Sequence, residues 1–368
     1  MNEVEILKKL ISFQTNTDFY DNKIREFILL VLKKHIEQAE IVPDTKKRCF
    51  FVKIKKIQQS KKRPLVFLCH LDTIVPASKW ISNPYHPIEK GDRIIGVGAS
   101  DMKGSIAAIL KAIINSTSIK RDVFLAFTSD EETTVKNIEK LARRLRIEKT
   151  IVIAPEPTAG DIRIGQKGIL EVKITMPGKS YHASKATIEV NKKDNAIYKM
   201  GMVINYTKRQ ELVFNKEKDD FFESSTINLG KISGGSVVNC VADNCALEIS
   251  YRLNNTTPLE KVFEEIEKEI KQIDKKAQLD ILLEGDSFIN TNERDLINLK
   301  KIVRRYFEKS SPILGKAWSE VVLFNKQKNS CFILGPGETN QSHKPNEFIK
   351  VDNLNKFCRL YSNILEEI

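Results

Sequence analysis

Residues 64–72 read PLVFLCHLD, a short apolar run that ends in a histidine and an aspartate. Such a run is typical of a strand that is buried on both faces of a sheet. The same signal returns in DVFLAFTSDEE (122–132) and TIVIAPEPT (150–158), and apolar residues at helical spacing fill residues 101–116 and 136–147. Strands that alternate with helices predict an α/β fold with a mostly parallel central sheet and helices on both faces.

The pattern changes at about Gly168, where GILEVKITM alternates apolar and polar residues. A helical stretch, two strands, a second helix and a further strand follow, at residues 188–205, 225–232, 246–253, 258–273 and 277–283. The order β-α-β-β-α-β predicts an antiparallel sheet with helices on one face, the ferredoxin-like arrangement. We therefore expect an inserted domain at residues 168–283, within a domain formed by residues 1–167 and 284–368. The second part of that outer domain is expected to hold a helix at 292–309, the strand SCFILG and a final helix at 352–366.

The composition suits a folded chain with a large core, since 41% of the 368 residues are hydrophobic. No apolar run reaches the length of about 18 residues that a membrane-spanning helix needs, so we expect no membrane partner. The first residues, MNEVEILKKLISF, contain early acids and predict an ordinary helix rather than a signal peptide. Six scattered cysteines fit no paired framework, which favours reduced thiols and a cytoplasmic location.

The chain is basic, with 60 Lys and Arg against 48 Asp and Glu and a net charge of +12. The densest basic stretch, residues 53–63, lacks interleaved aromatic residues and any DNA-binding signature. We interpret it as a solvated strand pair and turn, and expect no specific nucleic-acid partner. A positive field can still attract anionic substrates.

Candidate site residues collect where the predicted parallel strands end, because ligands bind at the carboxyl ends of such strands. They are His70, Asp72, Asp130, Glu131, Glu132 and Glu156. Of the five histidines, His35 falls on a polar stretch that we interpret as a helix, and His86 falls in a loop. Both are expected to have structural or surface roles.

Each candidate has an ordinary explanation when it is taken alone. A histidine and an aspartate two apart in a strand point the same way, so Asp72 can accept the second ring N–H of His70, but such pairs also occur in cores. Asp101 can serve as a helix cap. Glu131 and Glu132 form either a solvated turn or a costly buried pair.

Glu156, between two prolines, is either an acid of a rigid turn or a metal ligand, and His343 follows a glycine-rich loop in which it can be simply exposed. Taken together, however, two histidines, an aspartate able to bridge and two glutamates supply the ligands of a two-metal site. Nitrogen and carboxylate ligands in this mixture favour zinc or a similar divalent ion. Glu131 is then left beside Glu132, in a place suited to moving protons.

The motifs HLDT, GVGASDMKG, SDEE, EPT, GKSYHAS and GPG…SHKPNE occur in this order from His70 to near the C-terminus. This order resembles the di-zinc aminoacylase and carboxypeptidase family, which includes acetylornithine deacetylase, succinyl-diaminopimelate desuccinylase and glutamate carboxypeptidases. The strings KWISNP, TINLGKISGG and GPGETNQSHKPNEFI, and the pair Ser319-Glu320, most resemble acetylornithine deacetylase, an enzyme of arginine biosynthesis.

The resemblance implies roles for ten residues. Asp101 bridges two ions, with His70 and Glu156 completing one site, Glu132 and His343 completing the other, and Asp72 orienting His70. Glu131 is the general base and acid. His182, on the inserted domain, helps to hold the oxyanion and reaches into the partner subunit of a homodimer, while Asn239 and Arg252 grip the substrate carboxylate.

For the last three residues the alternatives are a surface histidine, a turn asparagine and a strand arginine that pairs locally. The sequence also departs from the family around the arginine, because Ser250 stands where an aspartate is usual and two extra residues precede Pro258. In addition, Gly201 falls inside the first predicted helix of the inserted domain and is expected to weaken it.

The predicted function is the metal-dependent removal of an acyl group, favoured as acetyl, from an N-acyl amino acid such as N-acetylornithine. Hydroxide formed at two zinc ions, or cobalt ions, attacks the amide with Glu131 as the base, and the inserted domain closes as a lid. The alternatives in the same family are a di- or tripeptidase, a carboxypeptidase and succinyl-diaminopimelate desuccinylase. A non-enzymatic descendant is disfavoured because all five ligands and Glu131 are present.

Overall fold

The structure, a computed structural model, describes residues 1–16, 19–42, 49–56, 62–133, 136–145, 148–217, 219–315, 317–325 and 329–368. The chain forms two compact units. Unit 1 contains Met1–Gly165, Ile289–Ile313 and Ser319–Ile368, and unit 2 contains Gln166–Phe288 and Leu314–Trp318. Part of the basic stretch at residues 53–63 lies outside the described residues.

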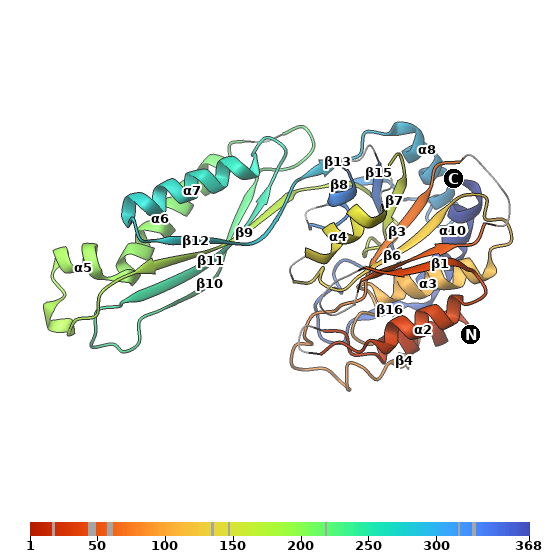
Figure 1. The fold of residues 1–368 in the computed structure, drawn as a ribbon, viewed down its shortest axis with the longest axis horizontal. Coiled ribbons are helices and arrows are strands. Elements are labelled where there is room, and N and C mark those ends of the chain that lie inside the picture. The colour runs from red at the N-terminus through yellow and green to blue at the C-terminus, as the bar shows by residue number, and fades with distance from the viewer. Residues whose placement is uncertain are drawn as a thin grey trace. The chain divides into compact units, whose positions relative to one another are not determined.

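The main sheet of unit 1 has a parallel centre (Figure 1). Among the described residues it contains nine strands. Its order is β1 (Ile36–Ile41), β2 (Phe50–Ile54), β6 (Val123–Thr128), β3 (Leu65–His70), β7 (Ile151–Ala154), β15 (Ser330–Ile333), β8 (Ile162–Gln166) and β13 (Phe288–Ile289), with β14 (Pro312–Gly315) paired to β8. Strands β6, β3, β7 and β15 run parallel, while β1 and β2 pair antiparallel at one side and β8 pairs antiparallel with β15. The predicted α/β fold class is confirmed. A second, small sheet joins β4 (Ile88–Lys90), β5 (Arg93–Ile95) and β16 (Phe348–Lys350).

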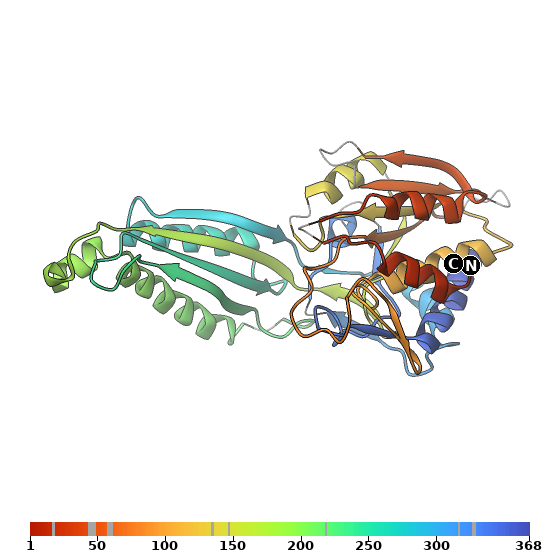
Figure 2. The same ribbon diagram turned by 90° about the horizontal axis from the view of Figure 1, so that it is seen from below.

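Helices cover both faces of the main sheet, as Figures 1 and 2 show for α3 and α10 on one side and α4 on the other. One core cluster joins the strands to α1 (Glu3–Ile11), α2 (Lys23–Leu32), α3 (Lys103–Asn115), α8 (Glu293–Val303) and α10 (Val351–Glu367). The second face carries α4 (Lys136–Leu145) and α9 (Val322–Asn325), which contact β6 and β15.

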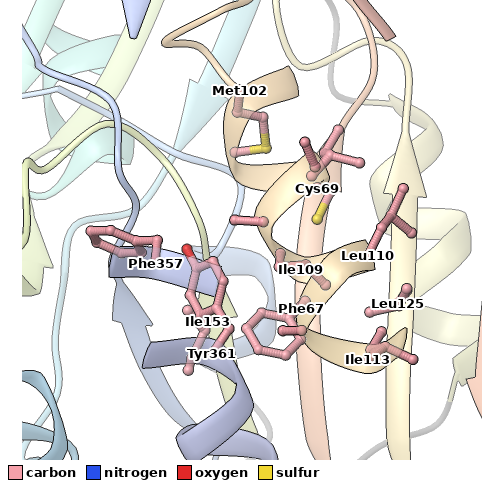
Figure 3. Packing of buried hydrophobic residues seen from close by; sticks show 14 of the residues in the cluster. Phe67, Cys69, Met102, Ile109, Leu110, Ile113, Leu125, Ile153, Phe357 and Tyr361 are labelled. Carbon is pink, nitrogen blue, oxygen red and sulfur yellow. The ribbon is translucent and has the colours of Figure 1, made fainter. Parts of the chain in front are cut away.

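The burial of β3 on both faces explains the apolar run at its centre. Phe67 points into the cluster shared with α3 and α10, where its ring meets that of Tyr361 edge-on at a centroid distance of 5.2 Å (Figure 3). Val66 and Leu68 are equally buried but lie outside this cluster, so they face the opposite layer. The residues on both faces of β3 are therefore apolar, because each face packs against a layer of helices.

Unit 2 is a four-stranded antiparallel sheet with helices on one face. Its strand order is β10 (Thr226–Gly234), β11 (Asn244–Leu253), β9 (Gly168–Pro177) and β12 (Gln278–Gly285). Alternate residues of β9 and β11 pack against α6 (Ala196–Phe214) and α7 (Leu259–Ile273) in one cluster. The succession is the expected β-α-β-β-α-β. The segment Leu314–Trp318 also belongs to this unit, and the Trp318 indole occupies the space where a side chain at Gly285 would lie.

Several predicted elements differ in detail. The helix expected at residues 188–205 is two helices, α5 (Ile188–Asp194) and α6, because Asn195 ends the first and its side chain caps the second. Gly201 lies within the continuous α6. The helix expected at 292–309 ends at Val303. His35 precedes strand β1 instead of lying on a helix, since the following residues pair with β2.

No helix in the described part of the chain is both long and apolar enough to cross a membrane.

Candidate metal centre

The site of unit 1 lies at the edge where three neighbouring parallel strands end. His70 is the last residue of β3, Glu131 and Glu132 follow β6, and Glu156 follows β7. Because β6, β3 and β7 are adjacent and parallel, their carboxyl ends meet at one edge and bring these side chains together. The fold thus collects residues that are far apart in the sequence.

His70 is fully buried and held at three points. Its backbone N–H donates to the sulfur of Met102 at 3.3 Å, and its Nδ1 lies 2.9 Å from the backbone carbonyl of Asp72. The opposite ring atom, Nε2, lies 3.2 Å from Oδ1 of Asp101 and 3.7 Å from Oε2 of Glu156. With a hydrogen on Nδ1 bonded to the carbonyl, Nε2 keeps its lone pair for a ligand on the carboxylate side.

The predicted contact between the Asp72 carboxylate and the ring of His70 is not the one observed. Oδ1 of Asp72 stays 3.8 Å from Nδ1, because β3 ends at His70 and the alternation of side chains does not continue to Asp72. The backbone carbonyl takes the ring N–H instead. The other carboxylate oxygen, Oδ2, accepts the backbone N–H of Glu132 at 3.0 Å, so Asp72 fixes the segment that carries Glu132.

Asp101 lies just before α3, whose N-cap is Met102 with no side-chain cap, so Asp101 does not cap the helix. Its carboxylate belongs to two groups whose donor atoms lie within 4.8 Å of one another. One group contains His70, Asp101 and Glu156, and the other contains Asp101, Glu132 and His343. A third group of this kind joins His70, Glu131 and Glu132. In the second group Nε2 of His343 lies 3.1 Å from Oε1 of Glu132.

The electrostatics of the cluster are those of crowded, buried acids. Burial is the largest cause that raises the pKa of Asp72 to about 6 and that of Glu156 to about 7, and it holds the pKa of Glu131 well above its usual value. Burial opposes the charge on His70, yet the carboxylates of Glu156 and Asp101 raise its pKa well above 6.5.

The hydrogen bond to Glu132 is the main cause that raises the pKa of His343 to about 9. Asp101 differs from Asp72, Glu131 and Glu156, because burial, which would raise its pKa, is outweighed by the hydrogen bond and charge of His70, and the pKa of Asp101 is lowered to about 2. Within the described residues, the only cationic side chains paired with the cluster acids are these two histidines.

These residues fit a pair of divalent ions. Among the described residues no lysine or arginine forms an ion pair with these carboxylates, and of them the nearby charge of Arg163 acts on only Glu156 and Asp101. The remaining deficit of positive charge is one that two ions would neutralise. Imidazole and carboxylate donors converge within the distance that a shared ion requires, and Asp101 is common to both sets. Glu131 belongs to a third group, which it forms with one member of each of these two sets, His70 and Glu132.

Three charged residues next to the cluster were given no role from the sequence. Glu320 is buried and accepts the hydroxyl hydrogen of Thr128 at 2.9 Å. Arg163 donates to the backbone carbonyl of Pro157 at 3.1 Å, beside Glu156. Glu347 is buried and accepts three backbone hydrogens near Asp101. Glu320 and Glu347 fall within the sequence strings on which the family resemblance rests. Their place in these strings was the only feature of the sequence that could have marked them as part of the site.

The remaining predicted residues belong to unit 2. His182 is exposed and caps a short 3-10 helix, Ala183–Lys185, and its segment is bridged to Cys240. The backbone carbonyl of Asn239 accepts the N–H of Ala183 at 2.8 Å, so the His182 and Asn239 segments lie side by side. Arg252 lies 3.8 Å from Glu171, whose same oxygen accepts the hydroxyl of Ser250 at 2.9 Å.

Within unit 2 these residues occupy opposite ends of the sheet. The His182 and Asn239 segments lie beyond the end where Asn244 pairs with Pro177, whereas Arg252 pairs with Ile169 at the other end. Residues 244 and 252 are separated along β11 by roughly 26 Å at about 3.3 Å for each residue. One copy of unit 2 therefore cannot place all three side chains on one small molecule.

Comparison with known proteins identifies the family of the chain. The sequence profile of peptidase family M20/M25/M40 matches residues 66–367. The chain is similar to a succinyl-diaminopimelate desuccinylase from Wolbachia pipientis subsp. Culex pipiens, at 25% identity over all of this chain and 93% of that protein. It is also similar to an acetylornithine deacetylase from Buchnera aphidicola subsp. Schizaphis graminum, at 26% identity over 77% of this chain and 75% of that protein.

Among solved structures, an M20 family metallo-carboxypeptidase from Sulfolobus solfataricus matches with a TM-score of 0.77 at 17% identity, over all of this chain and 99% of that chain. This likeness supports the fold. The family match covers most of the chain and agrees with the resemblance seen in the motifs. The chain belongs to peptidase family M20/M25/M40 and is a metal-dependent hydrolase of amide bonds.

Proposed function

We propose that this chain removes the acyl group from an N-acyl amino acid by using two divalent ions held in unit 1. The observation that carries the proposal is the pair of ligand sets that share Asp101, with Glu131 beside them. His70, Asp101 and Glu156 hold one ion, and Asp101, Glu132 and His343 hold the other. Asp72 positions His70 and Glu132 through its backbone carbonyl and its carboxylate, respectively.

The ions, when bound, supply Lewis acidity and lower the pKa of water enough to give hydroxide near neutral pH. Glu131 then accepts the proton of the attacking water and returns it to the nitrogen of the leaving amine. Burial raises the pKa of Glu131 above its ordinary value, which strengthens its carboxylate as a base for this proton. His182 donates a hydrogen bond to the oxyanion, and Arg252 and Asn239 hold the carboxylate of the amino acid.

The two named relatives support a substrate that carries a free carboxylate beside the amide bond. One is called a desuccinylase and the other a deacetylase, and each name describes the removal of an acyl group. The Ser319-Glu320 pair and the string GPGETNQSHKPNE favour acetyl, whereas the desuccinylase aligns over the whole chain and favours succinyl. N-acetylornithine and N-succinyl-diaminopimelate are therefore the two substrates to compare first.

The separation of His182 from Arg252 supports a homodimer. If both residues contact the same substrate, one must come from a second copy, because the sheet of unit 2 holds them at opposite ends. Strand β10 is an edge of that sheet, and its exposed Leu229 and Ile232 offer an apolar surface for such a copy. All six cysteines are free thiols, which suits the cytoplasmic location that we propose.

A substrate panel tests the proposal. The metal-free chain is reloaded with zinc or with cobalt and assayed with N-acetylornithine, N-acetylcitrulline, N-acetyllysine, N-succinyl-diaminopimelate, dipeptides and tripeptides. We expect hydrolysis of one acyl amino acid to exceed that of every peptide by at least about tenfold in kcat/KM, or about 1.4 kcal/mol of transition-state binding. Faster hydrolysis of a peptide would make the chain a peptidase, and binding of metal with no hydrolysis of any substrate would contradict the enzymatic role.

A further inference from the structure

Glu347 forms a link between two parts of the metal centre. Its buried carboxylate accepts three backbone hydrogens from one loop, those of Gly98 at 2.9 Å, Ser100 at 2.7 Å and Asp101 at 2.9 Å. Its own backbone carbonyl accepts a fourth, from Gly96 at 2.9 Å. Glu347 therefore binds four backbone N–H groups of the segment that ends in Asp101.

Glu347 also lies four positions after His343, immediately before β16. The turn between them is tightly formed, since His343 and Asn346 both have positive φ angles, of 64° and 59°. The side chain of Asn346 accepts the backbone N–H of Ile81 at 2.7 Å, which fixes the turn to unit 1. The position of Glu347 thus determines the spacing between the backbone of Asp101 and that of His343.

Stability alone is a poor reason to place a carboxylate here. Glu347 is buried next to another acid, Asp101, and the costs of desolvation and of like charges add. The basic residue closest in sequence to this loop, Lys103, donates to the backbone carbonyl of Phe13 at 2.8 Å, and it interacts with Glu347 through charge without a direct ion pair. What favours a carboxylate is the set of backbone N–H groups, because an ionised oxygen accepts several at once more strongly than a neutral one.

We propose that Glu347 is a positioning residue that fixes the separation of Asp101 and His343 and thereby sets the affinity for the ion that these residues share with Glu132. The proposal rests on the ligand assignment of the proposed function. The other set depends less on Glu347, because His70 is held by the Asp72 carbonyl and by Met102, and His70 in turn contacts Asp101. The two ions should therefore respond differently to a change at this position.

The test is a calorimetric titration of the metal-free chain with zinc, together with the visible spectrum of the cobalt-loaded chain. Glu347→Gln keeps an oxygen for one side of the loop but turns an NH₂ group toward a backbone N–H. We expect two ions in the unchanged chain, and in the variant a loss of about 10- to 100-fold in the affinity of one ion only, as is usual for groups that orient metal ligands. The cobalt spectrum should change for that ion and persist for the other.

Glu338→Gln is the matched control, because Glu338 lies on the same segment, its side chain pairs with Lys350 at 2.7 Å, and its contact with Ser100 uses the backbone carbonyl, which the substitution keeps. It should bind both ions normally. Equal affinities in Glu347→Gln and the unchanged chain would overturn the proposal, as would an equal loss for both ions accompanied by a lower Tm.

If Glu347→Gln fails to fold, Glu347→Asp is tested in its place, because the aspartate keeps the negative charge but has a side chain that is shorter by one methylene group. Selective weakening in that variant supports the proposal, and normal binding of both ions overturns it. An unchanged chain that does not bind two ions contradicts the ligand assignment itself, whereas two ions with no selective effect in the variants contradicts only the role of Glu347.

Discussion

Unit 1 brings its acids together where β3, β6 and β7 end and keeps them out of water, whereas unit 2 leaves His182 exposed and places Arg252 at the far end of its sheet. A parallel sheet gathers side chains at one edge within a single chain. An antiparallel sheet with long strands instead separates them, so its polar residues need another surface to complete a site. In the proposed function, unit 1 therefore supplies the catalytic cluster, and unit 2 supplies the residues that recognise the substrate.

The largest effect is expected from removing the base of unit 1. Glu131→Gln should lower kcat by about 1,000-fold, because the loss of a general acid–base group costs about 10²–10⁴. Metal content should stay near two ions per chain, since Glu131 is in neither of the two proposed ligand sets, and mass spectrometry of the metal content checks this. Glu89→Gln, at an exposed partner of Lys8, is the control. Near-normal turnover would remove Glu131 from its role.

The next largest effect is expected from His182, and it tests whether this residue of unit 2 serves the metal centre of a second copy of the chain. His182→Ala alone should lower kcat by about 100-fold or more, the cost of one oxyanion donor. Mixing this variant with Glu131→Gln after dissociation and reassembly should restore up to about a quarter of normal activity, because about half of the dimers are mixed and each has one complete site.

If His182 served the site of its own chain, every site in the mixture would lack one residue. No activity would then return. Assay before and after reassembly, with size-exclusion chromatography to confirm mixed species, separates the two outcomes.

A smaller effect is expected at the other end of the sheet of unit 2. Arg252→Lys should raise KM by about tenfold and change kcat less, because lysine keeps the charge but loses the planar fork that binds a carboxylate. Arg209→Lys, at an exposed partner of Glu269, provides the control. An unchanged KM would mean that Arg252 serves only its local pair with Glu171.

The smallest effect concerns the stability of the metal-free chain. The pKa values of Asp72 and Glu156 are raised to about 6 and about 7, so folded unit 1 holds protons that the unfolded chain has already lost. These protons contribute to the free energy of unfolding; the contribution is fully present below pH 4 and is lost as the pH rises through 6 to 7. His343 acts in the same direction, because its raised pKa of about 9 gives stability that is lost as the pH rises from 6.5 to 9.

The Tm of metal-free unit 1 should therefore fall between pH 5 and pH 8, by about 2–4 °C for each kcal/mol lost. Each unit contains one of the two tryptophans, Trp80 in unit 1 and Trp318 in unit 2, so Trp80→Phe and Trp318→Phe allow fluorescence to follow one unit at a time. A parallel fall in both units, or a rise in unit 1, would contradict the assignment of this pH dependence to the acid cluster.

The sequence predicted the fold class because both periodicities were strong. The run at residues 65–70 and the alternation of β9 each indicate how many faces of a strand are buried, and the structure agrees. Residues of the cluster could be named because each follows a predicted strand or lies in a motif. The contacts between them could not, since the partner of the His70 ring depended on where β3 ends, which is a matter of one or two residues.

Other features of the structure could not be predicted from the pattern of apolar and polar residues. Asn195 separates α5 from α6 through a cap that resembles any polar residue within a helical stretch. Glu347 acts on backbone N–H groups more than 200 positions earlier in the chain, and its own neighbours in sequence give no sign of this. Such long-range bonds between a side chain and a backbone have no periodicity to detect.

The short segment Leu314–Trp318 has a practical consequence for protein engineering. Because it packs with unit 2 while its neighbours belong to unit 1, the chain passes between the units four times, at 165/166, 288/289, 313/314 and 318/319. A graft of residues 166–288 alone would leave the surface at Gly285 bare, without the indole that covers it. Any chimera that exchanges recognition units between relatives must therefore carry this pentapeptide as a second insert.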